Sequence, residues 1–158
     1  MKKIIIFAFA LLISTLTFAQ HEGHQMAKTD IDPVLMAYYK IKNALVESDA
    51  KTVAKEAKEL SGLLAKAPKA VGDEAYQAAQ AMAKSTDIAA QRAQLGPLTE
   101  GVYQAVKKEG KLEDAVYYAY CPMANGNKGG YWLSDKKEIA NPYFGSKMLK
   151  CGSVKETL

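Results

Sequence analysis

The feature that most constrains the fold is a series of amphipathic segments between residues 32 and 109. Within each segment, apolar residues recur three or four positions apart, the spacing that places them on one face of an α-helix. Short connections that contain Ser48-Asp49, Pro68 and Gly96-Pro97 separate the segments. Helices joined by short connections pack antiparallel. The pattern therefore predicts a mainly α fold, in which an antiparallel four-helix bundle forms the larger part.

Turn and capping residues set approximate bounds for these helices. The first is expected to begin at Asp32-Pro33, because Asp32 can cap the free amides and Pro33 lacks an N–H that the first turn does not use. Ser48-Asp49 marks the end of this helix and the start of the next, and Pro68 closes the second. The four predicted helices are residues 32–46, 50–65, 73–95 and 97–109.

After Gly110 the pattern changes to short aromatic and β-branched runs. Ala115 to Tyr120 and Tyr131 to Leu133 predict extended strands, and residues 147–150 are a candidate third strand. The stretch from Asn141 to Gly145 predicts a tight turn, with glycine in a backbone conformation that other residues resist. We therefore expect residues 31–158 to form one domain, a helical bundle that carries a small irregular C-terminal β/turn unit.

The N-terminus predicts export. Lys2 and Lys3 precede an apolar run that is too short to span a bilayer, and Thr17-Phe18-Ala19 fits a signal-peptidase site. Residues 1–19 are therefore predicted to be a cleaved signal peptide, which leads to the periplasm without membrane insertion after cleavage. Losing the two lysines lowers the formal net charge from +4 to +2, which is too weak to indicate a nucleic-acid partner.

Residues 20–30 contain both histidines of the chain and lack the apolar spacing that would hold them against a core. We expect a flexible arm. Imidazoles at His21 and His24, with the thioether of Met26, could capture copper. The alternative is an unstructured leader whose histidines are incidental.

Both cysteines lie in the C-terminal segment, residues 115–152, and each has a methionine nearby. Cys121 precedes Met123 by two positions, and Met148 precedes Cys151 by three. Thiolates and thioethers are soft donors that favour Cu(I) over magnesium, calcium or manganese. The usual zinc spacings and the Cys-x-x-Cys-His haem motif are absent. These four residues are therefore the candidate metal ligands, with Cu(I) as the expected ion.

A Cys121–Cys151 disulfide is the competing interpretation, because an exported chain folds in an oxidising compartment. The bridge would close a loop of 31 residues, counted inclusively, and would stabilise the domain by roughly 3.5 kcal/mol. With the bridge formed, Met123 and Met148 could still bind Cu(I), more weakly. The sequence leaves both readings open.

Each candidate catalytic motif in the sequence is incomplete, so we expect the protein not to be an enzyme. Ser134-Asp135 has no histidine partner in a segment that is expected to be ordered, which argues against a hydrolytic triad. Gly126, Gly129 and Gly130 lack the Gly-Lys-Ser/Thr ending of a phosphate loop. A thiol-redox enzyme is also disfavoured, because the cysteines are far apart in the sequence.

Several blocks of the C-terminal segment resemble a known family. These blocks are Tyr120-Cys121-Pro122-Met123-Ala124, Tyr131-Trp132-Leu133-Ser134, and residues 139–149 (IANPYFGSKML) followed by Cys151-Gly152. They resemble exported domains of unknown function that occur alone or fused to CusB-like periplasmic adaptors of heavy-metal efflux pumps, and the likeness extends upstream through Asn43-Ala44-Leu45 and Gln91-Arg92.

What the resemblance implies is an association with the export of copper or a related metal, and a CusB-like adaptor as the partner. Together with the sulfur residues, it favours a periplasmic copper-binding protein that serves as a chaperone or accessory to a metal efflux system. The alternative is a disulfide-stapled interaction module that docks on an efflux adaptor or another envelope protein and binds no metal.

Overall fold

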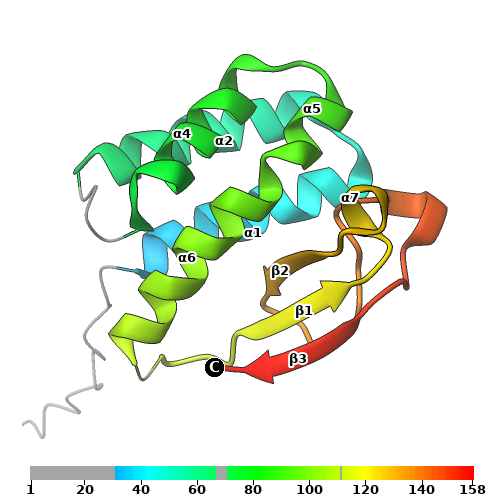
Figure 1. Ribbon diagram of the computed structural model, residues 1–158. Coiled ribbons are helices and arrows are strands. Elements are labelled where there is room, and N and C mark those ends of the chain that lie inside the picture. The colour runs from blue at the N-terminus through cyan, green and yellow to red at the C-terminus, as the bar shows by residue number, and fades with distance from the viewer. Residues whose placement is uncertain (1–30, 67–70, 111) are drawn as a thin grey trace, which may run out of the picture.

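The computed structural model describes residues 31–66, 71–110 and 112–158, so the predicted signal peptide and the His/Met arm lie outside the described residues. The chain is mainly helical and has a small three-stranded antiparallel sheet near its C-terminus (Figure 1). Within the described ranges, none of the helices combines the length and apolar character that crossing a bilayer requires. The principal helices are α1 (Asp32–Glu47), α2 (Ala50–Lys66), α4 (Asp73–Lys84), α5 (Ile88–Ala93) and α6 (Leu95–Glu109).

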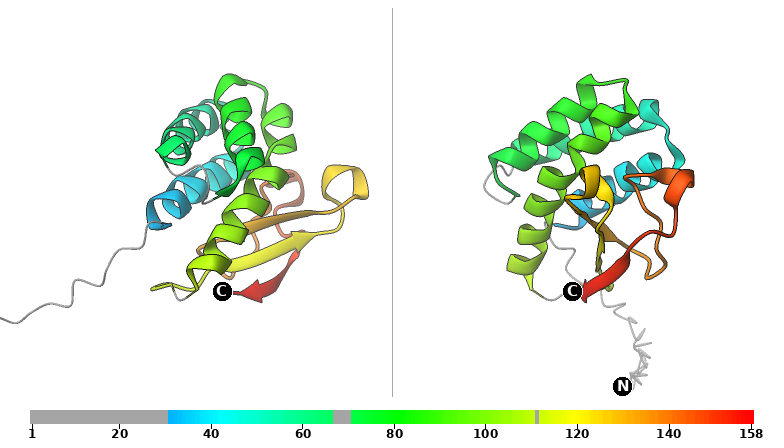
Figure 2. Two further views of the ribbon diagram at one scale, coloured as in Figure 1. Left: turned by 60° about the vertical axis from the view of Figure 1, so that its left-hand side comes forward. Right: turned by 45° about the vertical axis from the view of Figure 1, so that its right-hand side comes forward.

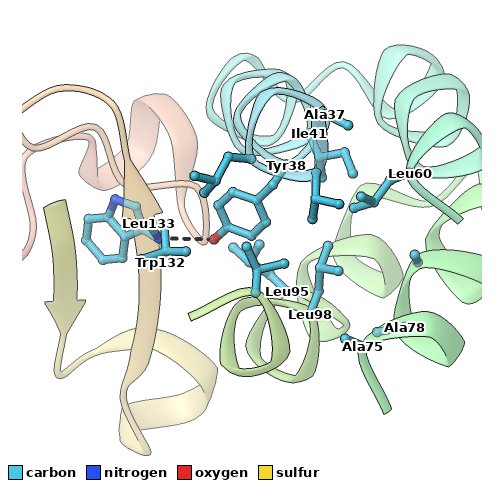
Figure 3. Packing of buried hydrophobic residues seen from close by; sticks show 14 of the residues in the cluster. Ala37, Tyr38, Ile41, Leu60, Ala75, Ala78, Leu95, Leu98, Trp132 and Leu133 are labelled. Atoms are coloured by element: carbon cyan, nitrogen blue, oxygen red, sulfur yellow. Dashed lines mark hydrogen bonds between the residues drawn. The ribbon is translucent and has the colours of Figure 1, made fainter. Parts of the chain in front are cut away.

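The apolar faces predicted from the sequence are buried between these helices. Helix α1 packs on α2, α2 on α4, and α4 on α6. Tyr38, Ile41 and Leu60 are fully buried at this centre, together with Leu95 and Leu98 of α6 (Figure 3). The small side chains of α4, such as Ala75 and Ala78, allow close approach of α6. One continuous core results, and it extends into the sheet.

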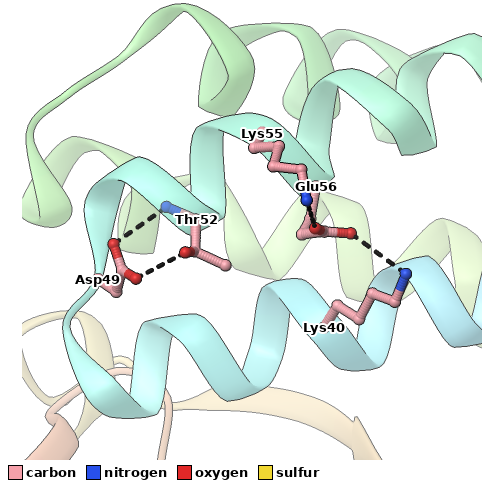
Figure 4. Close-up of polar contacts among 5 residues, drawn as sticks. All are labelled: Lys40, Asp49, Thr52, Lys55 and Glu56. Carbon is pink, nitrogen blue, oxygen red and sulfur yellow. Dashed lines mark hydrogen bonds and ion pairs between the residues drawn. The ribbon is translucent and has the colours of Figure 1, made fainter.

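The connection between α1 and α2 is built as the sequence predicted. Ser48 adopts a left-handed conformation that ends α1. Asp49 then accepts hydrogen bonds from the backbone N–H of Thr52, at 3.0 Å, and from its hydroxyl, at 2.6 Å (Figure 4). The Asp49 carboxylate thereby satisfies a free amide at the start of α2, as a capping residue does.

A buried carboxylate joins α1 and α2 one turn further along. Glu56 lies 3.1 Å from the Lys55 ammonium and 3.5 Å from that of Lys40 (Figure 4). Burial alone would raise the pKa of Glu56, but the two lysines outweigh it and hold the pKa below its usual value. The carboxylate is therefore kept charged inside the α1–α2 interface.

The prediction of one continuous third helix over residues 73–95 is wrong. The chain leaves the helix after Lys84 and starts α5 at Ile88, because Asp87 accepts a hydrogen bond from the N–H of Ala89 and caps a new helix. The buried Gln91 amide holds the break open by donating to the backbone carbonyls of Ser85 and Ala50. Helix α6 then begins at Leu95, so Gly96-Pro97 lies in its first turn and does not precede it.

The sheet contains the two predicted strands, but its third strand is not the predicted one. β1 (Tyr117–Cys121) is central and pairs antiparallel with β2 (Gly130–Ser134) and β3 (Ser153–Thr157). Residues 147–150 instead belong to the 3₁₀-helix η1 (Gly145–Met148) and the turn after it. Backbone bonds from Asn141 N–H to Leu149 O and from Cys151 N–H to Met148 O curl this stretch, so it cannot pair with β1. β3 was missed because it is a largely exposed edge strand with a single apolar residue among its five.

The sheet packs against α6 and α1 on one side of the molecule (Figure 2). The Tyr103 ring of α6 stacks on Tyr118 of β1, with ring centres 4.1 Å apart. The short segment α7 (Ala124–Asn127), in which Asn125 and Gly126 have left-handed backbone conformations, and η1 both lie toward the opposite end of the sheet from the C-terminus (Figure 1). This end of the sheet holds the sulfur residues.

Candidate sulfur site at the end of the sheet

The antiparallel pairing of β1 with β3 brings the two cysteines together. Cys121 is the last residue of β1, and Cys151 stands just before β3, whose first residue pairs with Tyr120. The Sγ atoms are 2.6 Å apart. This distance exceeds the 2.03–2.05 Å of a disulfide, and both cysteines are free thiols. Cys121 is fully buried and Cys151 half-buried.

Asn141 holds the Cys151 backbone in place. Its side chain is fully buried; the amide nitrogen donates to the Cys151 carbonyl at 2.8 Å, and the amide oxygen accepts from the Tyr143 N–H at 2.8 Å. Sequence analysis assigned Asn141 only to a tight turn. Its bond to a residue ten positions later could not be read from local pattern.

The two methionines line one surface pocket beside the cysteines. Met123 follows Cys121 closely and is 46% exposed, whereas Met148 lies at the end of η1 and is half-buried. The Met123 backbone N–H lies on the side of the Cys151 sulfur and slightly lowers the pKa of that thiol, against the larger opposing effect of Cys121. The pocket has a volume of about 490 Å³, and its walls come from α5, α7 and the loop that contains Tyr143 and Phe144. All four sulfur residues are thus gathered at this end of the sheet.

A single charged side chain, Arg92 of α5, lines this pocket among the described residues. Its guanidinium is directed to the protein itself: it donates to the carbonyls of Pro142 and Leu45, each at 2.9 Å, and to the Ser48 hydroxyl at 2.8 Å. Arg92 therefore ties the loop after β2 to the end of α1. The sequence offered no local signal for this role.

Gly145 allows the loop after β2 to lie against the end of α1. Its φ is +59°, and a Cβ there would lie 2.8 Å from the Val46 carbonyl oxygen and 2.9 Å from Arg92 Nη2. The predicted need for glycine at this turn is confirmed. The Trp132 ring packs beneath the same loop and is buried against Tyr143.

Comparison with known proteins places the helical part of the chain in a family. Residues 34–114, from α1 to the segment before β1, match the family described as a protein of unknown function (DUF3347). The chain belongs to the DUF3347 family. No curated protein and no solved structure matches it.

The expectation of a family of unknown function is thereby confirmed for this DUF3347 chain. The matched residues end before Cys121, so the sulfur site lies outside the matched region. The C-terminal blocks and the fusion to CusB-like adaptors remain predictions.

In the DUF3347 chain, the contact between the two cysteines favours the protonated form of the Cys151 thiol. The pKa of Cys151 is raised above its usual value, chiefly because its thiol hydrogen-bonds to that of Cys121, and burial adds to the effect. An ion chelated by two thiolates would lie about 2.3 Å from each sulfur, which places the sulfurs about 3.7 Å apart or more at a tetrahedral angle. The two sulfurs would therefore have to separate by about 1 Å to chelate one ion.

Other polar clusters of the described residues lie apart from the sulfur site. Within the described ranges, no group of three or more histidine, cysteine or acidic residues could hold a metal ion. His21, His24 and Met26 lie outside those ranges. Lys42 and Ser134 are both buried, with Nζ 3.5 Å from Oγ, and Lys42 also pairs with Asp135 at 3.5 Å. The Lys42 ammonium thereby joins α1 to the end of β2.

Proposed function

We propose that this DUF3347 protein is an exported Cu(I)-binding protein of the periplasm that serves a metal efflux system as a chaperone or accessory, and that it is not an enzyme. The observation that carries the proposal is the convergence of four sulfur side chains from two stretches far apart in the sequence. Met123 and Met148 share one pocket, and Cys121 and Cys151 lie in contact beside it.

The chemistry of the pocket favours Cu(I) over harder ions. Magnesium and calcium require several oxygen donors, usually carboxylates, and no carboxylate lines this pocket within the described chain. Thioethers bind soft ions through polarizable sulfur and need no opposite charge, so the nearby guanidinium of Arg92 is tolerated. The cysteines join as ligands when their sulfurs separate.

The remaining parts have supporting roles in this proposal. The helices form the four-helix-bundle scaffold on which the sulfur segment is built, and the arm with His21, His24 and Met26 captures copper before transfer. A CusB-like adaptor of an efflux pump is the partner that receives it. Export through residues 1–19 supplies the compartment in which these steps occur.

Intact-protein mass spectrometry under non-denaturing conditions tests the metal site. The mature chain is measured with and without Cu(I), beside Met123→Leu and Met148→Leu variants. We expect a copper adduct that weakens in each variant and is lost in the double variant. Met36→Leu is the matched control, because Met36 is the most exposed methionine in the described residues and lies on α1, away from the pocket. A copper adduct of equal strength in the double variant and the control would overturn the proposed site.

The 2.6 Å contact between Cys121 and Cys151 favours a second candidate, a disulfide-stapled interaction module that docks on an efflux adaptor or another envelope protein. In that case the thiols of the periplasm-purified chain resist alkylation, no copper is taken up, and partner capture survives the Met123→Leu and Met148→Leu changes. Copper uptake that depends on these methionines would exclude a purely structural role for the segment.

A further inference from the structure

The spacing of the two cysteine sulfurs suits bond formation better than chelation. At 2.6 Å the Sγ atoms are closer than two ligands of one ion can be, yet only about half an ångström from the length of a disulfide. Asn141 fixes the Cys151 carbonyl, and the pairing of β1 with β3 places the two strand ends side by side, so the pair is held in this contact.

A soft-ion pocket lies directly beside this pair. Cys121 and Met123 are two residues apart, and the Met148 carbonyl accepts a hydrogen bond from the Cys151 N–H at 3.0 Å. The thiols can donate electrons, whereas the thioethers of Met123 and Met148 bind the reduced form of copper and exchange no protons with it. Reducing equivalents and the ligands for the reduced product therefore meet at one end of the sheet.

We infer that the Cys121–Cys151 pair reduces Cu(II) to Cu(I), which the neighbouring methionine pocket then retains. Two Cu(II) ions each accept one electron, and each thiol releases one proton to solvent. A single S–S bond forms between Cys121 and Cys151, and two Cu(I) ions are produced. The reaction is stoichiometric, because the chain consumes its own thiols and is left bridged. This inference rests on the proposed Cu(I)-binding function and adds the oxidation state in which copper arrives.

The test uses the mature chain with its thiols reduced, the reductant removed and oxygen excluded. Cu(II) sulfate is added, and three quantities are measured: Cu(I) captured by a chromogenic chelator, thiols that remain reactive to a thiol reagent, and the mass of the chain. We expect one Cu(I) for each thiol lost and a chain lighter by two hydrogens. Copper retained after desalting should persist in the wild type and disappear when both Met123 and Met148 are changed to Leu.

Cysteine variants distinguish copper reduction that is coupled to the Cys121–Cys151 bridge from reduction by a single thiol. Cys151→Ser changes the half-buried member, and Cys121→Ala avoids a hydroxyl group in the buried site, so at least one variant can fold normally. Either should lose the fast intramolecular formation of Cu(I). Thiols that stay reactive after Cu(II) addition, equal Cu(I) yields in the variants, or covalent dimers in place of an internal bridge would each overturn the inference. A separate experiment supplies Cu(I) directly to the bridged chain. Uptake in that experiment supports the proposed function even if the chain does not reduce Cu(II).

Discussion

The Tyr38 hydroxyl of α1 accepts a hydrogen bond from the Leu133 backbone N–H of β2, at 3.1 Å, across 95 positions of sequence (Figure 3). The same hydroxyl contacts the Thr99 hydroxyl of α6 at 2.7 Å. One fully buried tyrosine therefore joins two helices to the sheet. Because β2 pairs with β1, which ends at Cys121, this contact also fixes the sheet on which the sulfur site is built.

Changing Tyr38 to Phe is predicted to lower the free energy of unfolding by about 2 kcal/mol. The variant leaves the buried Leu133 N–H without its acceptor and the Thr99 hydroxyl without its partner, and an unsatisfied buried group costs about 1–3 kcal/mol. The measurement is urea denaturation at pH 7, followed by circular dichroism. Tyr76→Phe is the control, because Tyr76 is only partly buried and its hydroxyl has no hydrogen bond within the described chain. A loss no larger than that of the control would contradict the role given to Tyr38.

The same variant should change the response to high pH. Burial raises the pKa of Tyr38 from 10.0 to about 12, so the folded state keeps the phenol proton over a range in which the unfolded chain has lost it. The stabilising contribution of the neutral phenol is therefore complete below pH 10 and declines between pH 10 and 12. The difference in unfolding free energy between wild type and Tyr38→Phe should narrow over that range. A constant difference would show that Tyr38 does not titrate as proposed.

Gly145→Ala is predicted to destabilise the protein by about 2 kcal/mol or more. The left-handed backbone disfavours a side chain by roughly 1–2 kcal/mol, and the added Cβ would press on the Val46 carbonyl and the Arg92 guanidinium. Gly96→Ala is the matched control, because a Cβ there meets no atom within 4 Å and the residue lies in a helical turn. We expect the control to be neutral or slightly stabilising. Equal effects of the two changes in thermal denaturation would refute the argument.

The features of this fold that could be predicted from the sequence are set by neighbouring residues, and the others depend on contacts between distant ones. The amphipathic faces, the Ser48-Asp49 turn and the two aromatic strands follow from spacing and turn residues, so they could be predicted. The break at residues 85–87 could have been suspected from Asp87, a strong capping residue, but the long apolar pattern masked it. The hydrogen bonds of Arg92 and Asn141 span 50 and 10 positions, and no local rule indicates such partners. The pairing of the cysteines depended on β3, an edge strand with little apolar signal.

Asn141→Ala is predicted to slow formation of the Cys121–Cys151 bond several-fold. The change removes the hydrogen bond that anchors the Cys151 carbonyl, so the Sγ atoms would spend less time in contact. The rate is measured by loss of reactive thiols under a mild oxidant, with folding checked by circular dichroism. Asn43→Ala, on the exposed face of α1, is the control and should leave the rate unchanged. Equal rates in wild type and Asn141→Ala would show that Asn141 has no part in positioning the pair.

Closing the bridge is predicted to raise the unfolding free energy by roughly 3.5 kcal/mol relative to the reduced chain, the value expected for a loop of 31 residues. The gain arises mainly because the bridge restricts the unfolded chain. Urea denaturation of the oxidised and reduced forms measures this gain. A Cys121→Ala, Cys151→Ala double variant shows how much of the difference in unfolding free energy is caused by the oxidant and not by the bridge. A gain below about 1 kcal/mol would mean that the bridge strains the folded sheet end.

The pH dependence of Cu(I) uptake should distinguish thiolate ligands from thioether ligands. A thiolate becomes available only after its proton leaves, and the pKa of Cys151 is raised by its contact with Cys121. The folded thiol therefore stays protonated throughout pH 5–8, and each proton displaced by copper strengthens apparent binding by about tenfold per pH unit. Thioethers carry no proton, so uptake by the bridged chain through Met123 and Met148 should be flat over the same range. Competition with a Cu(I) chelator, corrected for the chelator's own protonation, measures both forms. The chain measured carries His21→Ala and His24→Ala, because imidazoles also release protons when they bind a metal ion. A flat profile for its reduced form would remove the cysteines from the ligand set.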